Sequence, residues 1–482
     1  MRKALTCTIL LLVLAVGGIC LTARTVFAAH DQVTYTETLR EGSPSAANGA
    51  VVSLGMQYDY RLFWDTVFKA GSAPLSETQH VQTQYTCHLT QYYGRLEPSY
   101  NGVTLQNSYD NGVSYFDTDG RIADVSPLAA AYDALYDKTA PGKEGKLTVL
   151  VQDYYEYYPI SGQIHLPGCS IELTDAVAPE YVGISPYATA EQWNDFQSFF
   201  RIPVLPDEKL ELTLGRDESG RVWHYGRNGV DGGDGFGLYT YSAITADSCY
   251  FTFDCHTFSG KLVDTSLIPG GYGLYRLPYT TNDDGTTEPQ TGALEMVCPL
   301  DPDAELCGMR LDPTGTRLLL FTVKNDAYIL TVIDLRSMQQ LQQLPICELG
   351  ENSVIQNYDG GDFFTVLCGN GSFTLLQAQL DGSYTPALSG QLPLEALGSG
   401  LYQSFDMDYD GTRLAVVSLL NDDTYAYRIY GFSLCICDAD GLRFWGEYRS
   451  SLAAGFDPDD SYHYLCHLAA DDALRVRWTN ET

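Results

Sequence analysis

The feature that most constrains the fold is a unit of about 48 residues that recurs through the second half of the chain. Its two clearest copies read Asp-Pro-Thr-Gly-Thr-Arg at residues 312–317 and Asp-Tyr-Asp-Gly-Thr-Arg at residues 408–413, each followed by an apolar run. The first aspartates of these copies are 96 positions apart, which is two units. Weaker copies occur around Asp217, Asp359 and Asp457. A repeat of this length indicates one supersecondary structure that is used several times.

Each copy has the composition of a small antiparallel sheet. The Asp, Pro and Gly residues suit a tight turn, because Gly adopts positive φ angles without steric cost. An apolar strand, a polar turn and a second strand with partial alternation follow. One such sheet cannot bury both of its faces, whereas copies stacked around an axis bury them against each other. We therefore predict an all-β protein, a β-propeller of about seven or eight four-stranded blades that follows an N-terminal segment.

The repeat resembles the WD40-like and YVTN-type propeller superfamily. The stretches at residues 312–318 and 408–414 carry this resemblance, which is clear over residues 205–482 and weak before them. The Trp-Asp ending and Gly-His start of eukaryotic WD repeats are absent. The resemblance implies a propeller fold and does not imply a particular function.

The first half of the chain is less regular. We predict residues 1–28 as a signal peptide or signal-anchor helix, residues 29–205 as divergent blades or a separate β-domain, and residues 206–482 as blades with the repeat. Strands are expected at Val33–Leu39, Leu147–Val151 and Ile164–Leu173, and short helices at Ser126–Leu135 and Ala188–Phe200. The strand at Val33–Leu39 is expected to pair near residues 474–478 and close the ring.

The N-terminal segment has the pattern of an export signal. Arg2 and Lys3 precede an uncharged stretch, Ala4–Ala23, which is long enough to span a bilayer. Small residues before Ala29 also fit a cleavage site after Ala28. We expect a single-pass anchor in a bacterial-type cell membrane with an extracellular C-terminal domain; cleavage near Ala28 would instead give a secreted protein.

The chain is strongly acidic, with 61 acidic against 28 basic residues and a net charge of −33. Such a surface repels phosphate backbones, so we predict no nucleic-acid partner. The acids are dispersed through many turns, which is typical of a solvated surface.

The chain contains 13 cysteines, most of which we expect to be buried thiols. Cys249 with Cys255, and Cys298 with Cys307, are close enough in sequence to form local disulfides in an exported protein. No CxxC pair occurs, which disfavours a zinc site.

The sequence contains no nucleophile elbow, zinc-binding helix or phosphate-binding loop. We therefore assign no catalytic residue and no cofactor, and an enzyme is the less favoured class. One metal site remains open, because Asp406, Asp408 and Asp410 precede Gly411 as in the first half of a calcium-binding loop. Val417 stands where such a loop needs a bidentate Glu, so an ordinary hairpin turn is the preferred interpretation and calcium the alternative.

Tyrosines crowd around Asp153 and Glu156 within residues 152–158. Aromatic rings beside carboxylates are typical of sugar sites, and paired carboxylates hydrolyse glycosidic bonds. Alternating tyrosines also pack well between blades. Our leading hypothesis is an extracytoplasmic, membrane-anchored binding or scaffolding propeller whose ligand is a protein or a cell-surface glycan. The alternative is a glycan-binding or glycan-hydrolysing propeller.

Overall fold

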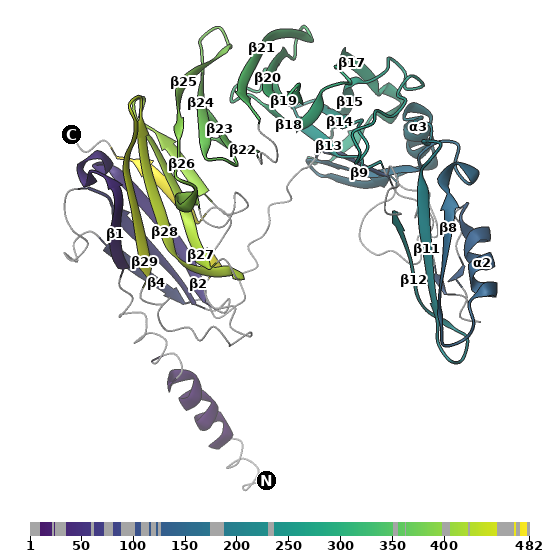
Figure 1. Cartoon of the computed structure of the whole chain (residues 1–482), viewed down its shortest axis with the longest axis horizontal. Helices are drawn as coiled ribbons and strands as arrows, with labels where there is room; N and C mark the ends of the chain where they lie inside the picture. The colour runs from purple at the N-terminus through teal and green to yellow at the C-terminus, as the bar shows by residue number, and fades with distance from the viewer. Residues whose placement is uncertain are drawn as a thin grey trace. The chain divides into compact units, whose positions relative to one another are not determined.

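The computed structural model (Figure 1) describes most of the chain between residues 35 and 479 and part of the segment before it. The described residues are 10–21, 24, 35–58, 62–71, 81–87, 102–107, 115–116, 122–123, 127–173, 188–229, 236–349, 355–361, 363–397, 405–422, 425–450, 467–468 and 473–479. They form two compact units, residues 1–96 with 349–482 and residues 97–348. The predicted boundary after residue 205 lies within the second unit.

The described residues of the first unit form three antiparallel sheets. Its strands are β1 (Tyr35–Gly42), β2 (Ala50–Tyr58), β3 (Leu62–Lys69), β4 (Val81–Cys87), β22 (Ile355–Asp359), β23 (Phe363–Cys368), β24 (Ser372–Ala378), β25 (Tyr384–Gln391), β26 (Phe405–Tyr409), β27 (Leu414–Asp422), β28 (Tyr425–Asp438), β29 (Gly441–Ser450), β30 (His467–Leu468) and β31 (Leu474–Trp478). Two of the sheets, β22-β23-β24-β25 and β26-β27-β28-β29, are the four-stranded meanders that the repeat predicts. β1 adds a fifth strand to the latter, and β2, β3 and β4 form the third sheet with β30 and β31.

The second unit is also mostly strands. They are β5 (Gly102–Asn107), β6 (Tyr115–Phe116), β7 (Ile122–Ala123), β8 (Glu144–Leu150), β9 (Ile160–Leu166), β10 (Cys169–Leu173), β11 (Lys209–Arg216), β12 (Val222–Gly229), β13 (Thr240–Ile244), β14 (Ser248–Phe253), β15 (Gly273–Thr281), β16 (Thr287–Pro289), β17 (Glu295–Pro299), β18 (Glu305–Leu311), β19 (Arg317–Lys324), β20 (Ala327–Asp334) and β21 (Gln339–Glu348). The sheet β18-β19-β20-β21 is a third complete meander, and β13-β14-β15 continues into β16 and β17. Over the described residues of the whole chain, seven sheets have three or more strands.

Successive sheets pack face to face, which is the stacking that defines propeller blades. In the first unit, Met407 and Val416 share one core cluster with the β22–β25 sheet, while Val417 and Phe432 share another with the β2–β3 sheet. In the second unit, Leu318 and other residues of the β18–β21 sheet pack on the β13–β15 sheet. The predicted all-β propeller fold is therefore confirmed.

Strands near both ends of the chain join sheets formed by distant strands, but they do not pair with each other as we expected. β1 pairs with β29, whereas Leu474–Trp478 forms β31 and pairs with β2. Burial explains the difference: β2 places Val52 and Leu54 in the core beside Val476 of β31. β1 is largely polar and exposed, so it suits the outer edge of its sheet.

The two predicted helices are confirmed as α2 (Ala129–Lys138) and α3 (Ala190–Phe199). Thr189 and Gln192 form a capping box at the start of α3, which satisfies backbone N–H groups of its first turn. The predicted single strand Ile164–Leu173 is wrong, because Gly168 adopts a φ of +69° and reverses the chain between β9 and β10.

Within the described segments no disulfide forms, and Cys249, Cys255, Cys298 and Cys307 are free thiols. Cys249 and Cys255 are buried, and this burial raises the pKa of each thiol to about 12. The expectation of buried thiols is thus confirmed for these two and for Cys368, Cys435 and Cys437.

Residues 10–21 are helical, and their apolar side chains are exposed. Among the described residues, no helix combines the length and apolarity needed to cross a membrane. Arg2, Lys3 and Ala28 lie outside the described residues.

Candidate functional site

The aspartates singled out for calcium lie on β26 and in the turn after it. Asp406 and Asp408 are two residues apart and both accept hydrogen bonds from the last strand, β31. The Oδ2 atom of Asp406 is 2.6 Å from the backbone nitrogen of Val476, and that of Asp408 is 2.7 Å from the backbone nitrogen of Trp478. These side chains replace the carbonyl groups that a neighbouring strand would offer, so they hold β31 against β26.

Asp410 has a different role, because its carboxylate closes the turn between β26 and β27. It accepts bonds from the backbone N–H groups of Thr412 and Arg413 and pairs with the guanidinium of Arg413. Asp312 does the same in the turn between β18 and β19, where it accepts from Thr316 and Arg317. Asp410 is therefore the structural equivalent of Asp312, although the repeat alignment places Asp408 opposite Asp312.

All three carboxylates thus accept hydrogen bonds from the protein. Asp406 and Asp408 face β31, whereas Asp410 faces the β26–β27 turn. In the part of the chain that the structure describes, no group of three His, Cys, Asp or Glu side chains is placed to hold a metal ion. The calcium hypothesis at Asp406, Asp408 and Asp410 stays a prediction.

The tyrosines of residues 152–158 do not form one exposed surface. Tyr158 is buried, and its hydroxyl donates to the buried carboxylate of Glu208. Tyr157 is hydrogen-bonded at the surface to Glu156 at 2.9 Å. Tyr154 and Tyr155 pack against the core of the second unit. This arrangement agrees with the packing interpretation of these tyrosines.

His256 forms the best acid–base pair that we find in the described residues. Its Nδ1 atom is 2.8 Å from Oδ1 of Asp254, a geometry that fixes the ring. The backbone nitrogen of His256 also donates to the same carboxylate oxygen at 3.2 Å. Neither residue lines either of the two hollows described below.

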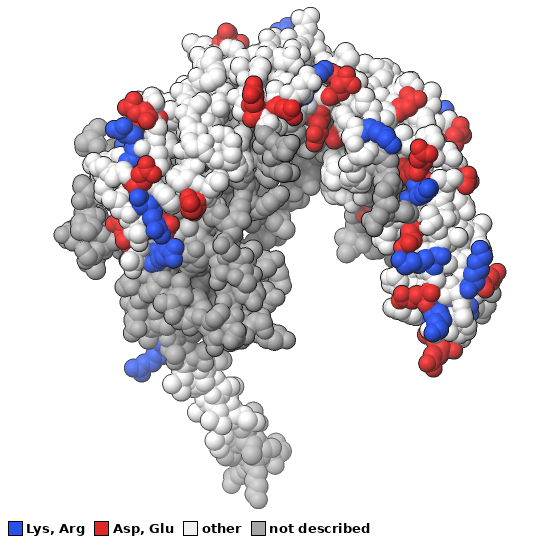
Figure 2. Space-filling model, in the orientation of Figure 1, with Lys and Arg blue, Asp and Glu red and all other residues white. Residues whose placement is uncertain are grey.

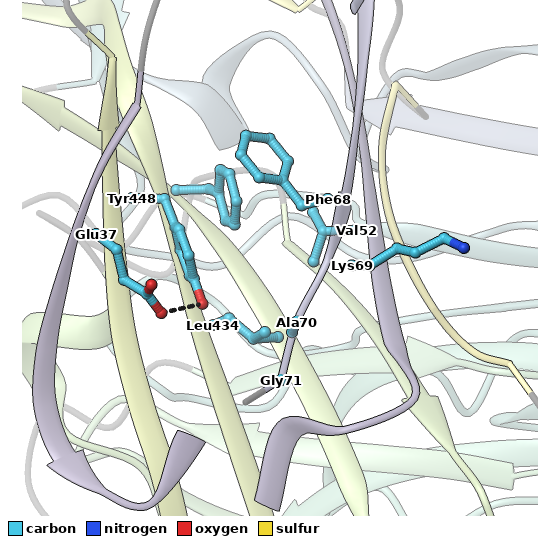
Figure 3. A pocket seen from close by; sticks show the side chains of 9 residues that line it. Glu37, Val52, Phe68, Lys69, Ala70, Gly71, Leu434 and Tyr448 are labelled. Atoms are coloured by element: carbon cyan, nitrogen blue, oxygen red, sulfur yellow. Dashed lines mark hydrogen bonds between the residues drawn. The ribbon is translucent and has the colours of Figure 1, made fainter. Parts of the chain in front are cut away.

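One hollow lies in the first unit between β1, β28 and β29 on one side and β2 and β3 on the other (Figure 3). Its cavity volume is only about 10 Å³, and it lies beside the stacked rings of Phe432 and Tyr448, whose centroids are 4.7 Å apart. The Tyr448 hydroxyl donates to Glu37 at 3.2 Å, as the dashed line in Figure 3 shows. Burial raises the pKa of Tyr448, so this hydroxyl stays protonated. Because its polar groups already pair with each other, this hollow offers a ligand little beyond apolar contact.

A second hollow, with a cavity volume of about 80 Å³, lies in the second unit on one face of the β18–β21 sheet. Its floor is apolar and includes Leu306, Leu320 and Tyr272. The segment from Pro299 to Ala304, which leads from β17 into β18, forms the opposite wall.

The strand register explains why polar side chains meet in this hollow. Leu320, Thr331 and Gln343 lie opposite one another on β19, β20 and β21, so they form one row on the same face. Thr322 stands two positions from Leu320 and belongs to the same face. Gln340 would face the other way in a regular strand, but a bulge in the β20–β21 pairing turns it toward the hollow.

Four of these polar side chains make no hydrogen bond to any part of the chain that the structure describes; they are Thr322, Thr331, Gln340 and Gln343. Thr331 is the most informative, because the residue is only 6% exposed. Its hydroxyl opens into the hollow, where water or a bound ligand can supply the hydrogen-bond partner that a polar group in such a site normally has.

Asp301 and Lys324 form an ion pair at the rim of the same hollow. The hydrogen bond from Lys324 lowers the pKa of the Asp301 carboxyl, and the same contact raises the pKa of Lys324. Both groups are therefore charged at neutral pH and cancel each other. Across the described surface in Figure 2, acidic and basic side chains are likewise interspersed.

Sequence reasoning did not single out this hollow. The signal that could have indicated it is the run Gln339-Gln-Leu-Gln-Gln343, which places neutral amides on a strand where apolar residues are usual.

Comparison of the sequence with models of protein families gives no match, and comparison with curated proteins gives none either. Several solved structures are similar. A protein from Lactobacillus plantarum is 11% identical, with a TM-score of 0.29 over 83% of this chain and 99% of that one. A periplasmic gluconolactonase from Pseudomonas aeruginosa is 13% identical, with a TM-score of 0.24 over 71% of this chain and 81% of that one. The β-propeller domain of a protein from Myceliophteria thermophila is 9% identical, with a TM-score of 0.21 over 50% of this chain and 93% of that one. The propeller fold is therefore assigned from the strand order and the face-to-face packing of this chain's own sheets.

Proposed function

We propose that this chain is an extracytoplasmic β-propeller, held at a membrane by its N-terminal segment, that binds a ligand without transforming it. The observation that carries the proposal is the hollow on the β18–β21 sheet, which combines an apolar floor with four unpartnered polar side chains. Such a combination is typical of recognition sites, because the floor supplies contact area and the polar groups supply orientation.

A binding role is favoured over catalysis by the chemistry of this hollow. Its charged groups, Asp301 and Lys324, neutralise each other across one ion pair, and burial raises the pKa of the Tyr272 hydroxyl well above its usual range. General acid–base catalysis needs a group whose proton is available near the working pH. The hydrogen-bonded pair of His256 and Asp254 does not line the hollow.

The location outside the membrane is supported by the sequence of residues 1–28. Two bases followed by a twenty-residue uncharged stretch direct export and leave the remainder outside. Fractionation of cells that express the full-length chain with a C-terminal tag tests this part. We expect the tag in the membrane fraction and accessible to protease added to intact cells; a tag protected inside the cell would contradict the proposal. Release of a soluble species that begins near Ala29 would replace the anchor with a cleaved signal.

The binding role is tested by capture of cell-envelope proteins and polymers on the full-length protein. Replacement of Gln343 by tryptophan should fill the hollow and abolish capture. The matched control is Gln377, an exposed glutamine on β24 of the first unit, changed to tryptophan in the same way. Equal capture by both variants would contradict a ligand site in this hollow.

A further inference from the structure

We propose that the hollow on the β18–β21 sheet binds a neutral carbohydrate, an inference that rests on the proposed binding function and names its ligand class. The hydrogen-bonding groups of the site disfavour a purely apolar ligand, its charge disfavours an ionic ligand, and its floor offers apolar contact to a sugar ring.

The hydrogen-bonding groups favour a ligand that both donates and accepts. The hydroxyls of Thr322 and Thr331 can do either, and the side-chain amides of Gln340 and Gln343 each offer donors and an acceptor. A purely apolar ligand would bury the Thr331 hydroxyl without a partner, which is unfavourable. Adjacent hydroxyl groups, each a donor and an acceptor, match this mixed set.

The charges disfavour an ionic ligand. Lys324 is already paired with Asp301, so the hollow has no net charge of its own with which to attract an anion. The whole chain carries a net charge of −33, which repels polyanions at long range. The ion pair can still strengthen binding of neutral hydroxyls, because hydrogen bonds to charged groups are stronger than those between neutral groups.

The floor supplies the apolar contact that the carbon–hydrogen face of a sugar ring needs. Leu306 and Leu320 are buried there. The Tyr272 hydroxyl donates to the backbone oxygen of Phe253 at 2.9 Å, which holds its ring in place. The ligand therefore meets a preformed surface and loses little affinity to rearrangement.

The test is calorimetric titration of the full-length protein with cellopentaose, maltopentaose and chitotetraose, in a detergent that has no sugar headgroup. Thr331→Val removes the hydroxyl that faces the hollow without changing the side-chain shape, and Gln343→Leu removes the amide. Their matched controls are Thr365→Val, which removes a buried hydroxyl without a partner on β23, and Gln377→Leu on β24.

We expect at least one saccharide to bind. Each variant of the hollow should weaken its affinity about five- to tenfold, the effect of one lost hydrogen bond, while the controls bind as the wild type does. Equal binding by all variants would overturn the assignment to this hollow. If no saccharide binds but Gln343→Trp abolishes capture of an envelope protein, the carbohydrate inference fails and the binding function stands. If no saccharide binds and Gln343→Trp changes no capture, both fail.

Discussion

Replacement of Asp406 by alanine should release the last strand, β31, from β26. The carboxylate accepts hydrogen bonds from the backbone nitrogen of Val476 at 2.6 Å, from Nη1 of Arg477 at 3.0 Å and from the Tyr358 hydroxyl. Val476 is buried and pairs with β2 on its other side, so no neighbouring strand offers it another acceptor. The variant leaves a buried donor without a partner.

The cost can be estimated contact by contact. A buried N–H that loses its acceptor destabilises the fold by about 1–3 kcal/mol. Arg477 is half exposed and regains water, so its lost ion pair adds less than about 1 kcal/mol. The Tyr358 hydroxyl keeps the backbone oxygen of Met407 at 2.8 Å and adds little. The expected loss in the free energy of unfolding is therefore about 1–4 kcal/mol.

Chemical denaturation measures this loss, and hydrogen exchange locates it. Exchange of the Val476 and Trp478 amides should accelerate by about fivefold or more, whereas amides in β19 should change much less. The control is Asp440→Ala, which removes an exposed carboxylate in the β28–β29 turn and should change stability by less than about 0.5 kcal/mol. If the Asp406→Ala and Asp440→Ala variants have the same free energy of unfolding and the same amide exchange in β31, Asp406 does not hold this strand.

Three further predictions follow from single contacts. Gly42→Ala should cost well over about 1 kcal/mol, because its φ is +80° and a Cβ would lie 2.0 Å from the Arg443 backbone oxygen. The control Gly260→Ala has a φ of +81° with open space, so comparable losses in thermal unfolding would refute the close contact. Burial, reinforced by Asp406, raises the pKa of Tyr358 to about 12. Its neutral form is favoured on folding, so this stabilisation is complete below pH ~10 and is lost as the pH rises toward 12. The pKa of Tyr358 is measured by ultraviolet titration of tyrosinate, as the difference between the wild type and a Tyr358→Phe variant. A difference spectrum that titrates near pH 10 would contradict the raised pKa. A chelator should leave the melting temperature unchanged, because Asp406, Asp408 and Asp410 already accept bonds from the chain. A fall in that temperature, reversed by added calcium, would support the calcium hypothesis.

Much of the local structure could be predicted from the sequence. The Asp-Pro-Thr-Gly-Thr-Arg turn at residues 312–317 has the hydrogen bonds that its composition predicts, and Gly315 adopts a φ of +67°. The two short helices also form close to the predicted positions. Turns and helices of this kind depend on neighbours within a few positions, so their signals lie side by side in the chain.

The candidate site was not predictable in the same way. Thr331 and Gln343 are neighbours because β20 and β21 adopt one register, and Gln340 joins them because of a bulge. A shift of one residue would have sent these side chains to the opposite face. The sequence shows polar residues on a strand but does not show which of them share a face with an unfilled space.

By itself, the sequence determined that the chain forms repeated antiparallel sheets, since turn residues and apolar alternation act over a few positions. Only the tertiary structure decided what Asp408 and Asp410 do, although both belong to the same repeat. Asp410 closes its own turn, while Asp408 binds Trp478, which is 70 positions away. The partner of a side chain at that distance depends on which strands the fold brings together, and local preferences do not encode it.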